Sequence, residues 1–483
     1  FFFDTVYAIN QPTEHIDKKI ADIKSKRETG LKGQLQQLAD LKNPNTILDP
    51  YVFSAYDIDD YIPEEGKFVA ADLKNMNLVL YEDGIQIDNM SILSKGKKGS
   101  RWETPGGLYE IQTKEKDHFS SLGSVHMPYS MQFYGNFFIH GWPYYPDGTL
   151  VEQGYSGGCI RLSTESARKV FNFVDNGTQF FVHEDSSSNL TTDIKIRNIP
   201  KPPLSAKSVI VADIKTGEVY FKKDSDILMP IASITKLVTA LVSNETISFG
   251  KRVTVNKDPG YSGEYPGNIS SGDAFYAEDL IYPLLMESNN SVAYSLSSYY
   301  GKDQFVSLMN KKARALGMLD TAFKDATGIS SGNISTAEDL FRLVEYLYNK
   351  QSFVLETSRT KNKFISSLNG KDYNINNFNI FSKKENFIGG KTGFTNAAGE
   401  TMVSIFDIEI ENGDKRTIAI IVLNSKDRGE DINNLLEWFN VAAIPVDQEV
   451  NIFSGDLYNY LRSSINYSAS KMMSSAIKSI GSK

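Results

Sequence analysis

Apolar and polar residues begin to alternate near Tyr61, and a period of two is the pattern of a half-buried β-strand. Strands are predicted over residues 68–73 and 77–81, and a third over residues 108–113 after the turn at Thr104-Pro105-Gly106-Gly107. Short strands continue to Phe138-Ile139. The segment from residue 61 to residue 184 is therefore predicted to be a mostly β domain.

Both ends of the chain show helical spacing instead. Apolar residues in the segment 1–60 recur every three or four positions on both sides of Thr29-Gly30, which predicts two short helices, a stalk, or a helical hairpin packed on the next domain. The tail, residues 446–483, repeats this spacing from Leu457 to Ile480, which predicts a membrane-surface helix or a helix packed on the enzyme body. The opening Phe1-Phe2-Phe3 is interpreted as the stump of a removed signal or anchor segment, or alternatively as an apolar start.

A polar and then proline-rich stretch, residues 185–207, is predicted to be a semi-rigid linker. After it, residues 208–214 and 218–223 are predicted to form a hairpin. The capping box Ser335-x-x-Glu338 predicts the start of a helix. Strands are predicted over residues 401–410 and 416–423, and a closing helix over residues 432–441. Residues 208–445 are therefore predicted to form a second domain with both strands and helices.

Composition limits what the chain can do. Its 483 residues suffice for about three domains, and 41% hydrophobic, 12% aromatic and 23% charged residues are typical of a globular protein. A net charge of −8 leaves no basic surplus to neutralise phosphates, which argues against a nucleic-acid partner. The single cysteine, Cys159, excludes an intramolecular disulfide. No apolar run reaches the ~18 residues of a spanning helix, so none is predicted.

Ser233 and Lys236 are the first candidates for chemistry, because they are three residues apart at the start of an apolar run. Residues three apart on a helix share a face, so the amine of Lys236 can reach the hydroxyl of Ser233. A lysine partly stripped of water can lose its proton and activate a serine. Taken alone, the pattern also fits an N-terminal serine beside a surface lysine.

Two later stretches favour the catalytic interpretation. Ser288 and Asn290 offer a second hydroxyl and a carboxamide, which can relay a proton and hold a peptide carbonyl. An inner strand that ends in Lys391-Thr392-Gly393 can dock an extended substrate and bind its C-terminal carboxylate. Ser-x-x-Lys, Ser-x-Asn and Lys-Thr-Gly, in this order, are the motif set of penicillin-binding enzymes.

On these motifs, residues 205–443 resemble a low-molecular-weight D-Ala-D-Ala carboxypeptidase, a serine peptidase that trims peptidoglycan stem peptides. The resemblance implies an α/β fold, with an antiparallel sheet flanked by helices as in β-lactamases. Class A β-lactamases need a deacylating glutamate after the second motif, and Glu-x-x-Leu-Asn is absent between Asn290 and Lys391. The resemblance therefore favours a peptidase.

The same resemblance assigns roles to individual residues. Ser233 would be the acylated nucleophile and Lys236 its general base. Ser288 and Asn290 would relay the proton and contact the substrate. Lys391 and Thr392 would bind its terminal carboxylate, and Gly393 would also lie in the substrate-binding strand. The backbone N–H groups of Ser233 and Phe394 would form the oxyanion hole.

Cys159 lies in a glycine-rich turn, after Gly157 and Gly158 and before a helix predicted over residues 164–174. Successive N–H groups of such a turn, near a helix N-terminus, favour a thiolate and can cradle an oxyanion. His140, at the end of a predicted strand, is placed to take the thiol proton. A cysteine in a glycine turn with a distant histidine is, taken alone, structural more often than catalytic.

The sequence around both residues, from residue 67 to residue 183, resembles the L,D-transpeptidase catalytic domain. These enzymes cleave a tetrapeptide stem after its third residue and pass the acyl group to a neighbouring stem, which makes a 3→3 cross-link. The resemblance makes Cys159 the nucleophile and His140 the base, with the backbone carbonyl of Gly141 orienting the imidazole. By the same resemblance, the backbone N–H groups of Gly157, Gly158 and Cys159 would bind the oxyanion. Arg161 would steady the loop. The family has histidine at the position of Gly157, so this departure is expected to slow acyl transfer or shift it towards hydrolysis.

Together the two resemblances predict a bacterial enzyme with two catalytic domains, in which the tetrapeptide made by the serine site becomes the donor for the cysteine site. The alternatives are a catalytically silent β domain that only holds stem peptides, and a serine domain that acts as an endopeptidase. Expected partners are stem peptides, β-lactams as covalent inhibitors and, through the termini, a membrane surface. The expected location is extracytoplasmic, in the cell wall or anchored at the outer face of the plasma membrane. No cofactor or metal is implied, because no ligand spacing relates His15, His118, His126 and His183.

Overall fold

The computed structural model describes residues 51–52, 58, 61–184, 194–248, 250–259, 267–410 and 413–445. The helices predicted in the segment 1–60 and in the tail, and most of the polar half of the predicted linker, lie outside the described residues. Within the described part, every helix is too short or too polar to cross a bilayer.

The β domain, residues 61–184, contains two sheets in its described residues. The strand order is β4-β3-β2-β10-β5 in one sheet and β6-β7-β8-β9 in the other. Side chains from both sheets, among them Val69, Met131 and Phe180, belong to one buried core. The strand bounds are β2 Lys67–Asp72, β3 Asn77–Glu82, β4 Ile85–Ser91, β5 Gly107–Glu110, β6 Thr113–Ser120, β7 Val125–Tyr134, β8 Phe137–His140, β9 Ile160–Arg161 and β10 Gln179–His183.

The sequence predicted one strand over residues 108–113, and this prediction is wrong in one respect. The segment forms the end of β5 and the start of β6, which belong to different sheets. At the corner between them, the Ile111 N–H donates to Thr178 O and the Gln112 N–H donates to Gln132 O, at 2.9 and 2.7 Å. The chain thus changes hydrogen-bonding partners within two residues, which the alternation of apolar residues does not reveal.

The α/β domain is built on an antiparallel six-stranded sheet with the order β1-β13-β12-β22-β21-β20, in which β1 comes from before the β domain and the other strands from residues 194–445. The prediction that residues 194–207 belong to a linker is wrong, because residues 194–196 pair with residues 443–445 and the side chains of Ile194 and Ile196 are part of a buried core. Every residue of β12 is buried, because helices cover both faces of the sheet. The bounds are β1 Tyr51–Val52, β12 Ser208–Asp213, β13 Glu218–Lys223, β20 Phe387–Thr395, β21 Gly399–Glu409 and β22 Lys415–Ser425. The fold class predicted from the sequence, a mostly β domain before an α/β domain, is confirmed.

β20 carries Lys391, Thr392 and Gly393, and it is the edge strand of this sheet rather than the inner strand that the sequence predicted. β20 pairs with β21 on one side only. An edge strand leaves N–H and C=O groups unpaired along its outer side, and these groups can pair with an extended peptide. The correction therefore strengthens the case for a peptide-binding strand.

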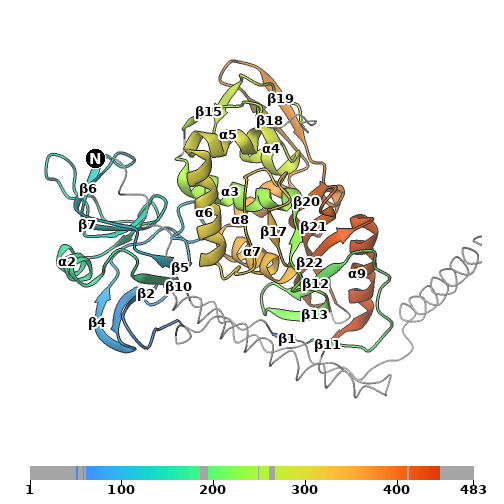
Figure 1. Ribbon diagram of the computed structural model, residues 1–483, viewed down its shortest axis with the longest axis horizontal. Coiled ribbons are helices and arrows are strands. Elements are labelled where there is room, and N and C mark those ends of the chain that lie inside the picture. Colours follow the sequence, from blue (N-terminus) through green and yellow to red (C-terminus); the bar gives the residue numbers. More distant parts are fainter. Residues whose placement is uncertain are drawn as a thin grey trace, which may run out of the picture.

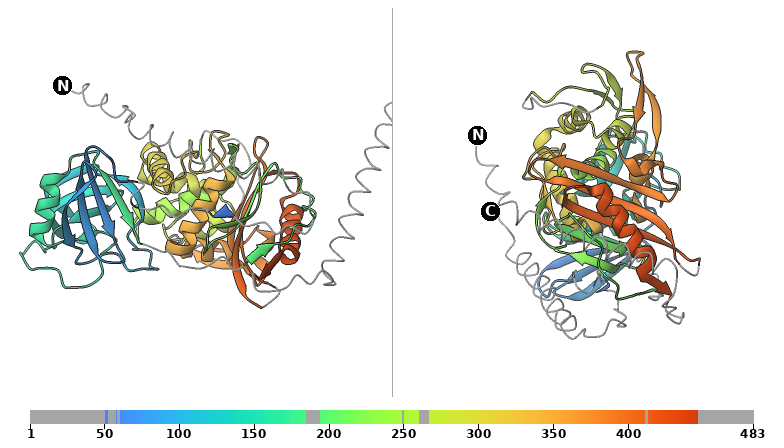
Figure 2. Two further views of the ribbon diagram at one scale, coloured as in Figure 1. Left: turned by 90° about the horizontal axis from the view of Figure 1, so that it is seen from below. Right: turned by 90° about the vertical axis from the view of Figure 1, so that its right-hand side faces the viewer.

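The molecule is layered. Figures 1 and 2 show the β domain at one end, then a layer of helices, then the six-stranded sheet, with α9 on the far face of the sheet. The helix bounds are α2 Thr164–Phe173, α3 Thr235–Thr246, α4 Ile281–Met286, α5 Asn290–Tyr300, α6 Lys302–Ala315, α7 Ala337–Lys350, α8 Ser352–Arg359 and α9 Arg428–Ala442. Short pairings complete the domain: β11 Ile194–Ile196 with β23 Ala443–Pro445, β14 Met229–Pro230 with β17 Ile334–Ser335, β15 Arg252–Thr254 with β16 Ala274–Tyr276, and β18 Asn362–Ser366 with β19 Asp372–Asn376.

α7 begins one residue later than the predicted capping box requires. Its N-cap is Thr336, whose hydroxyl accepts a hydrogen bond from the N–H of Asp339. Ser335 lies in β17, and its hydroxyl is paired with that of Thr321 at 2.7 Å. The strand pairing thus occupies Ser335, and the next hydroxyl caps the helix.

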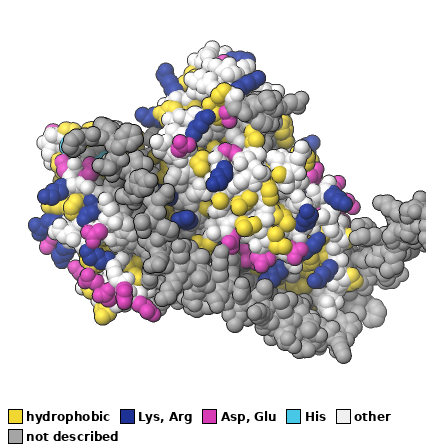
Figure 3. Space-filling view, viewed as in Figure 1, with side chains coloured by type: hydrophobic (Ala, Val, Ile, Leu, Met, Phe, Trp, Pro, Cys, Tyr) yellow, Lys and Arg dark blue, Asp and Glu magenta, His cyan; other side chains and the backbone are white. Residues whose placement is uncertain are grey.

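The β domain packs directly on the helical layer. A Cβ atom added to Gly107 in β5 would lie 2.5 Å from the backbone oxygen of Ala315 in α6, so only glycine fits at this contact. On the face seen in Figure 3, cationic and anionic side chains are interspersed, and apolar side chains gather over the middle of the α/β domain.

Candidate active site

Ser233 lies at a tight backbone turn that two glycines, Gly328 and Gly393, approach closely. It lies in the 3₁₀ helix η2, Ala232–Ile234, which leads directly into α3. Ala232 has φ +48°, a conformation that costs energy for a residue with a side chain. A Cβ atom on Gly328 would lie 2.1 Å from Ala232 O, and one on Gly393 would lie 3.0 Å from the Ser233 nitrogen. The two glycines let a loop and β20 approach the nucleophile from different sides.

The Lys236 amine lies at the centre of a hydrogen-bond set. Its Nζ is 3.0 Å from Ser233 Oγ, 2.7 Å from Asn290 Oδ1 and 2.5 Å from Thr327 O. The Asn290 and Thr327 oxygens can only accept, so they take two N–H donors. A neutral amine then keeps its lone pair for the Ser233 hydroxyl. The arrangement suits a base that removes the proton of Ser233.

The electrostatics point the same way. Lys236 is fully buried, and this burial lowers its pKa to about 7, although Asp325 opposes the shift. Near neutral pH, a large fraction of Lys236 is therefore uncharged. This is the state that a general base requires.

Asp325 shapes the loop that presents the Thr327 carbonyl to Lys236. Its Oδ1 accepts hydrogen bonds from the N–H and hydroxyl of Thr327, both at 2.7 Å, and from the Gly328 N–H at 2.6 Å. Its Oδ2 accepts from the Ser330 N–H at 2.8 Å. The role of this loop in holding the base was not predicted from the sequence.

Ser288 and Lys391 form a second pair. Lys391 Nζ donates to Ser288 Oγ at 3.0 Å and to Thr392 O at 2.8 Å. Ser288 has φ +57°, and Asn289 caps α5, in which Asn290 is the first residue. Burial, then the nearby charges of Lys236 and Arg428, lower the pKa of Lys391 well below its ordinary value. The structure thus forms two hydrogen-bonded groups, Lys236 with Ser233 and Asn290, and Lys391 with Ser288, which are close enough for the charge of Lys236 to act on Lys391.

Phe394 and Arg428 complete the rim beside β20. Phe394 is 62% exposed directly after Gly393, and Gly393 lies so close to Thr401 that a Cβ atom would be 2.5 Å from its hydroxyl. Arg428 donates from NH1 to Gly393 O at 2.8 Å. Arg428 was not predicted, because a single cation four residues before a predicted helix carries no motif. Its position places a second positive charge near the end of the Lys391 strand.

The cysteine candidates lie on neighbouring strands of the β domain. β8 and β9 pair in parallel, with Ile139 opposite Ile160 and His140 opposite Arg161. Extending this register by one residue places Cys159 opposite Phe138. Residues two apart on a strand share a face, so Cys159 and His140 lie on the same side of the ladder.

His140 is fixed in one tautomer. Its Nδ1 is 2.6 Å from Gly141 O, and a carbonyl can only accept, so Nδ1 carries the proton and Nε2 is the basic nitrogen. Burial lowers the pKa of His140 to about 4, partly opposed by this hydrogen bond. The imidazole is therefore neutral at physiological pH and able to accept a proton.

The expectation that the glycine turn favours a thiolate is wrong for this structure. Burial raises the pKa of the Cys159 thiol to about 11, and Arg161 and the Phe138 backbone only partly oppose it. The thiol points at Asn136 O, 3.8 Å from Sγ. Within the described residues, no hydrogen bond joins Cys159 to His140. Both groups are uncharged at neutral pH, so any proton transfer must accompany attack by the sulfur.

In the turn before Cys159, the Gly158 N–H and the Ser156 hydroxyl already form hydrogen bonds within the turn. The Gly158 N–H donates to Ser156 Oγ at 3.1 Å, and Ser156 Oγ donates to Cys159 O at 2.5 Å. Gly158 has φ +103°, and a Cβ atom would meet the Phe137 ring at 2.3 Å. Gly157 is exposed, with nothing within 4 Å of a Cβ atom. Arg161 lies over the Trp142 ring, 5.6 Å from its centroid.

Comparisons with known proteins cover both halves of the chain. Residues 196–427 match the D-alanyl-D-alanine carboxypeptidase family, and residues 66–182 match the L,D-transpeptidase catalytic domain. The chain is 32% identical over 257 residues to a D-alanyl-D-alanine endopeptidase of Pseudomonas aeruginosa, across 50% of this chain and 80% of that protein. It is 33% identical over 252 residues to the D-alanyl-D-alanine endopeptidase of Haemophilus influenzae, across 50% of this chain and 83% of that protein.

Among solved structures, a D-alanyl-D-alanine carboxypeptidase from Mycobacterium tuberculosis is similar over 51% of this chain and 97% of that one, with 25% identity and a TM-score of 0.45. The chain belongs to the D-alanyl-D-alanine carboxypeptidase family of penicillin-binding serine peptidases, and it carries an L,D-transpeptidase catalytic domain ahead of the peptidase domain.

Proposed function

We propose that the chain is a bifunctional peptidoglycan-remodelling enzyme. In this proposal the serine site removes the terminal D-Ala of a pentapeptide stem, and the cysteine site uses the tetrapeptide to form 3→3 cross-links. The observation that carries the serine half is the Lys236 amine, which is buried, close to neutrality and 3.0 Å from Ser233 Oγ. Family membership supplies the substrate class, and makes an extracytoplasmic location and peptidoglycan stems the natural setting.

For the serine site, Ser233 Oγ attacks the carbonyl of the D-Ala-D-Ala bond while Lys236 takes its proton. The N–H groups of Ser233 and Phe394 stabilise the oxyanion. Ser288 relays the proton to the departing amine, so D-Ala leaves and an ester remains on Ser233. Water, deprotonated by Lys236, then releases the shortened stem. Lys391, Thr392 and Arg428 provide the charge and donors that hold the substrate carboxylate.

For the cysteine site, the sulfur of Cys159 attacks the carbonyl of the third stem residue as its proton passes to His140 Nε2. The proton then moves to the nitrogen of the departing D-Ala, which leaves a thioester. The side-chain amine of a neighbouring stem attacks this thioester, and the thiol is restored. The support for this half is the shared face of Cys159 and His140 and the tautomer that Gly141 fixes.

The serine site has a second candidate activity, the opening of existing D,D-cross-links. The Pseudomonas and Haemophilus relatives are both endopeptidases, and this observation favours that reading. Both activities use one acyl chemistry and differ in how large a leaving group the cleft admits. Incubation with D,D-linked dimers separates them: monomers appear only if the cleft accepts a whole stem beyond the scissile bond.

The decisive experiment is mass spectrometry of muropeptides incubated with wild type, Ser233→Ala and Cys159→Ala. We expect Ser233→Ala to abolish loss of the last D-Ala, and Cys159→Ala to abolish tetrapeptide-dependent dimers. Unchanged dimers in Cys159→Ala would make the β domain a silent module that only holds stems. Penicillin should label wild type and Cys159→Ala covalently, but not Ser233→Ala.

Because both sites lie on one chain, the tetrapeptide released at the serine site should have a raised local concentration at the cysteine site, which should speed cross-linking. The test compares wild type with an equimolar mixture of the Ser233→Ala and Cys159→Ala proteins, each supplied with pentapeptide stems. Faster dimer formation by wild type is expected. Equal rates would show that the product diffuses freely between chains.

Anchoring at the membrane belongs to the same proposal and falls to residues 446–483, which lie outside the described residues. Co-sedimentation with anionic vesicles tests it. The full chain should sediment with the vesicles, and a chain that ends at residue 445 should not.

A further inference from the structure

The interface between the two domains closes over a buried ion pair. Lys312 in α6 and Glu245 in α3 lie 2.9 Å apart, and their side chains are 0% and 1% exposed. The β domain supplies the rest of the Lys312 environment: Tyr109 accepts a hydrogen bond at 2.9 Å, and the Tyr134 ring lies 4.4 Å from Nζ. Tyr134 also donates to Leu308 O at 3.3 Å. The C-terminal end of α3 is thereby fixed against the β domain.

Asn136 lies where this end of α3 meets the cysteine site. Its side-chain Nδ2 donates to Thr246 O at 2.9 Å. Thr246 is the last residue of α3, and carbonyls in the last turn of a helix have no partner within the helix. The preceding Gly135 lies so close that a Cβ atom would be 3.1 Å from the Thr246 side chain. The serine domain therefore holds the turn between β7 and β8.

The same turn holds the nucleophile of the other domain. The backbone oxygen of Asn136 is the acceptor towards which the Cys159 thiol points, at 3.8 Å. The strand that follows, β8, ends at His140. One residue thus contacts the α3 terminus through its side chain and the thiol through its backbone, and the base stands four residues further along.

We propose that Asn136 is a positioning residue for Cys159, and that the C-terminal end of α3 in the serine domain is its anchor. The cysteine site of this chain is then complete only while the two domains are packed. The proposal deepens the proposed transpeptidase activity, and it rests on that activity for one arm of its test only.

The consequence for reactivity has a definite direction. When the anchor is lost, the turn loosens, water reaches the sulfur and the thiol loses its fixed acceptor. Desolvation is the main cause of the raised thiol pKa, so the pKa falls and alkylation becomes faster. At the same time Cys159 and His140 lose their fixed relation, so turnover falls. Unfolding would also speed alkylation and slow catalysis, so unchanged penicillin acylation of Ser233 is the readout that separates this local effect from unfolding of the chain.

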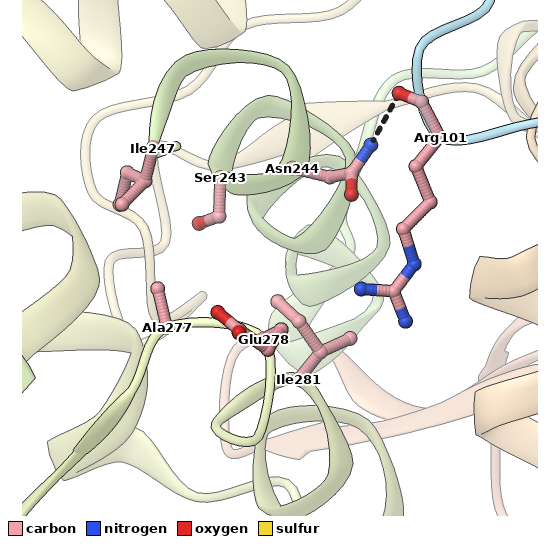
Figure 4. Close-up of a pocket in the computed structure, with 7 residues that line it drawn as sticks. All are labelled: Arg101, Ser243, Asn244, Ile247, Ala277, Glu278 and Ile281. Atoms are coloured by element: carbon pink, nitrogen blue, oxygen red, sulfur yellow. Dashed lines mark hydrogen bonds between the residues drawn. The ribbon is translucent and has the colours of Figure 1, made fainter. Parts of the chain in front are cut away.

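The test uses the full chain with Asn136→Ala, and with Asn136→Leu as a variant of similar size without a donor. The matched control is Asn244→Ala, because Asn244 also lies on α3 and donates across the interface, to Arg101 O at 3.3 Å, in a pocket whose lining does not include Cys159 (Figure 4). Alkylation of Cys159 by iodoacetamide is followed over pH, together with dimer formation and penicillin acylation of Ser233. Arg161 is the charged group whose field acts on the thiol, and none of the variants changes Arg161 or His140.

We expect the midpoint of the alkylation profile to fall by about one pH unit in both Asn136 variants, which makes alkylation about tenfold faster well below the midpoint. Dimer formation should fall at least about tenfold, and penicillin acylation should stay unchanged. An unchanged profile, an equal shift in Asn244→Ala, or a parallel loss of penicillin acylation would each overturn the assignment. If wild type forms no dimers, the proposed transpeptidation fails, but the alkylation profile still decides the role of Asn136.

Discussion

Lys236 combines two properties that rarely coexist in a lysine, complete burial and contact with a hydroxyl. The group is held by acceptors that suit a neutral amine with two donors and one free lone pair. Charge on the amine is needed only after the proton of Ser233 has been taken. Lys236 is therefore already in the uncharged state that a general base needs before the substrate binds.

We predict that acylation of Ser233 by penicillin rises with pH through about 7, the pKa of Lys236, because only the uncharged amine can accept the proton. Because the pKa of Lys391 is also lowered, the charge that holds the substrate carboxylate is lost at a lower pH than for an ordinary lysine. Stopped-flow acylation over pH provides the measurement. Lys236→Arg keeps a cation but no base, and should be at least about 100-fold slower. A profile that stays flat across neutrality would contradict this role.

Gly157 stands where the resemblance to L,D-transpeptidases leads us to expect a histidine, and the structure leaves room for such a side chain. A Cβ atom there meets nothing within 4 Å. We predict that Gly157→His leaves the melting temperature unchanged and raises the ratio of cross-linked dimers to hydrolysed stems, because the added imidazole supports acyl transfer. Chromatography of muropeptides gives that ratio. A lower ratio would mean that glycine at this position is itself suited to transfer.

β20 acts as a platform because its backbone approaches the Ser233 turn more closely than a side chain permits. Gly393 would place a Cβ atom 2.5 Å from Thr401 Oγ1 and 2.9 Å from Ile231 O. The strand therefore sets the distance between the nucleophile and the edge on which an extended substrate lies. Its position at the sheet edge leaves that side open.

We predict that Gly393→Ala costs about 1–3 kcal/mol of stability through overpacking and slows penicillin acylation at least about tenfold. Chemical denaturation and fluorescent penicillin labelling measure the two effects. Gly154→Ala is the control, since a Cβ atom there meets nothing within 4 Å. Equal acylation by both variants would show that β20 tolerates a wider separation from Ser233.

The sequence revealed the parts of the molecule that repeat a pattern. Alternation located β2, β3, β13 and most of the six-stranded sheet, and spacing paired Ser233 with Lys236. It could not reveal contacts between residues that share no pattern, such as Asn136 with Thr246 or Arg428 with Gly393. The burial of Lys312 and Glu245 was equally hidden, because charged residues on a helix are read as solvent-facing until the surface that covers them is known. The corner at Ile111 escaped for a related reason, since apolar alternation does not say which sheet a strand joins.

The β domain and the α/β domain pack directly on each other through buried contacts. The buried ion pair of Glu245 and Lys312 belongs to the α/β domain, and Tyr109 and Tyr134 of the β domain contact Lys312. A second contact, Lys350 with Glu103 at 3.2 Å, crosses the same boundary. Such an interface should couple the stabilities of the two halves.

We predict that Lys312→Ala destabilises the whole protein by about 3–5 kcal/mol, because it leaves Glu245 buried without its partner. Calorimetry should show one unfolding transition that moves as a unit. The double variant Lys312→Met with Glu245→Leu should recover much of the loss, since it removes both charges and fills the space. Two separate transitions, of which only one moves, would show that the domains unfold independently.

The shared burial of Lys312 also bears on how such a protein can change over time. Once tyrosines of one domain had come to shield a charge of the other, a descendant that lost either domain would have exposed an apolar surface in the part that remained. Separation would then require several compensating substitutions at once, whereas further refinement of the joint interface requires only one at a time. The buried contact thus favours inheritance of the two domains as one unit.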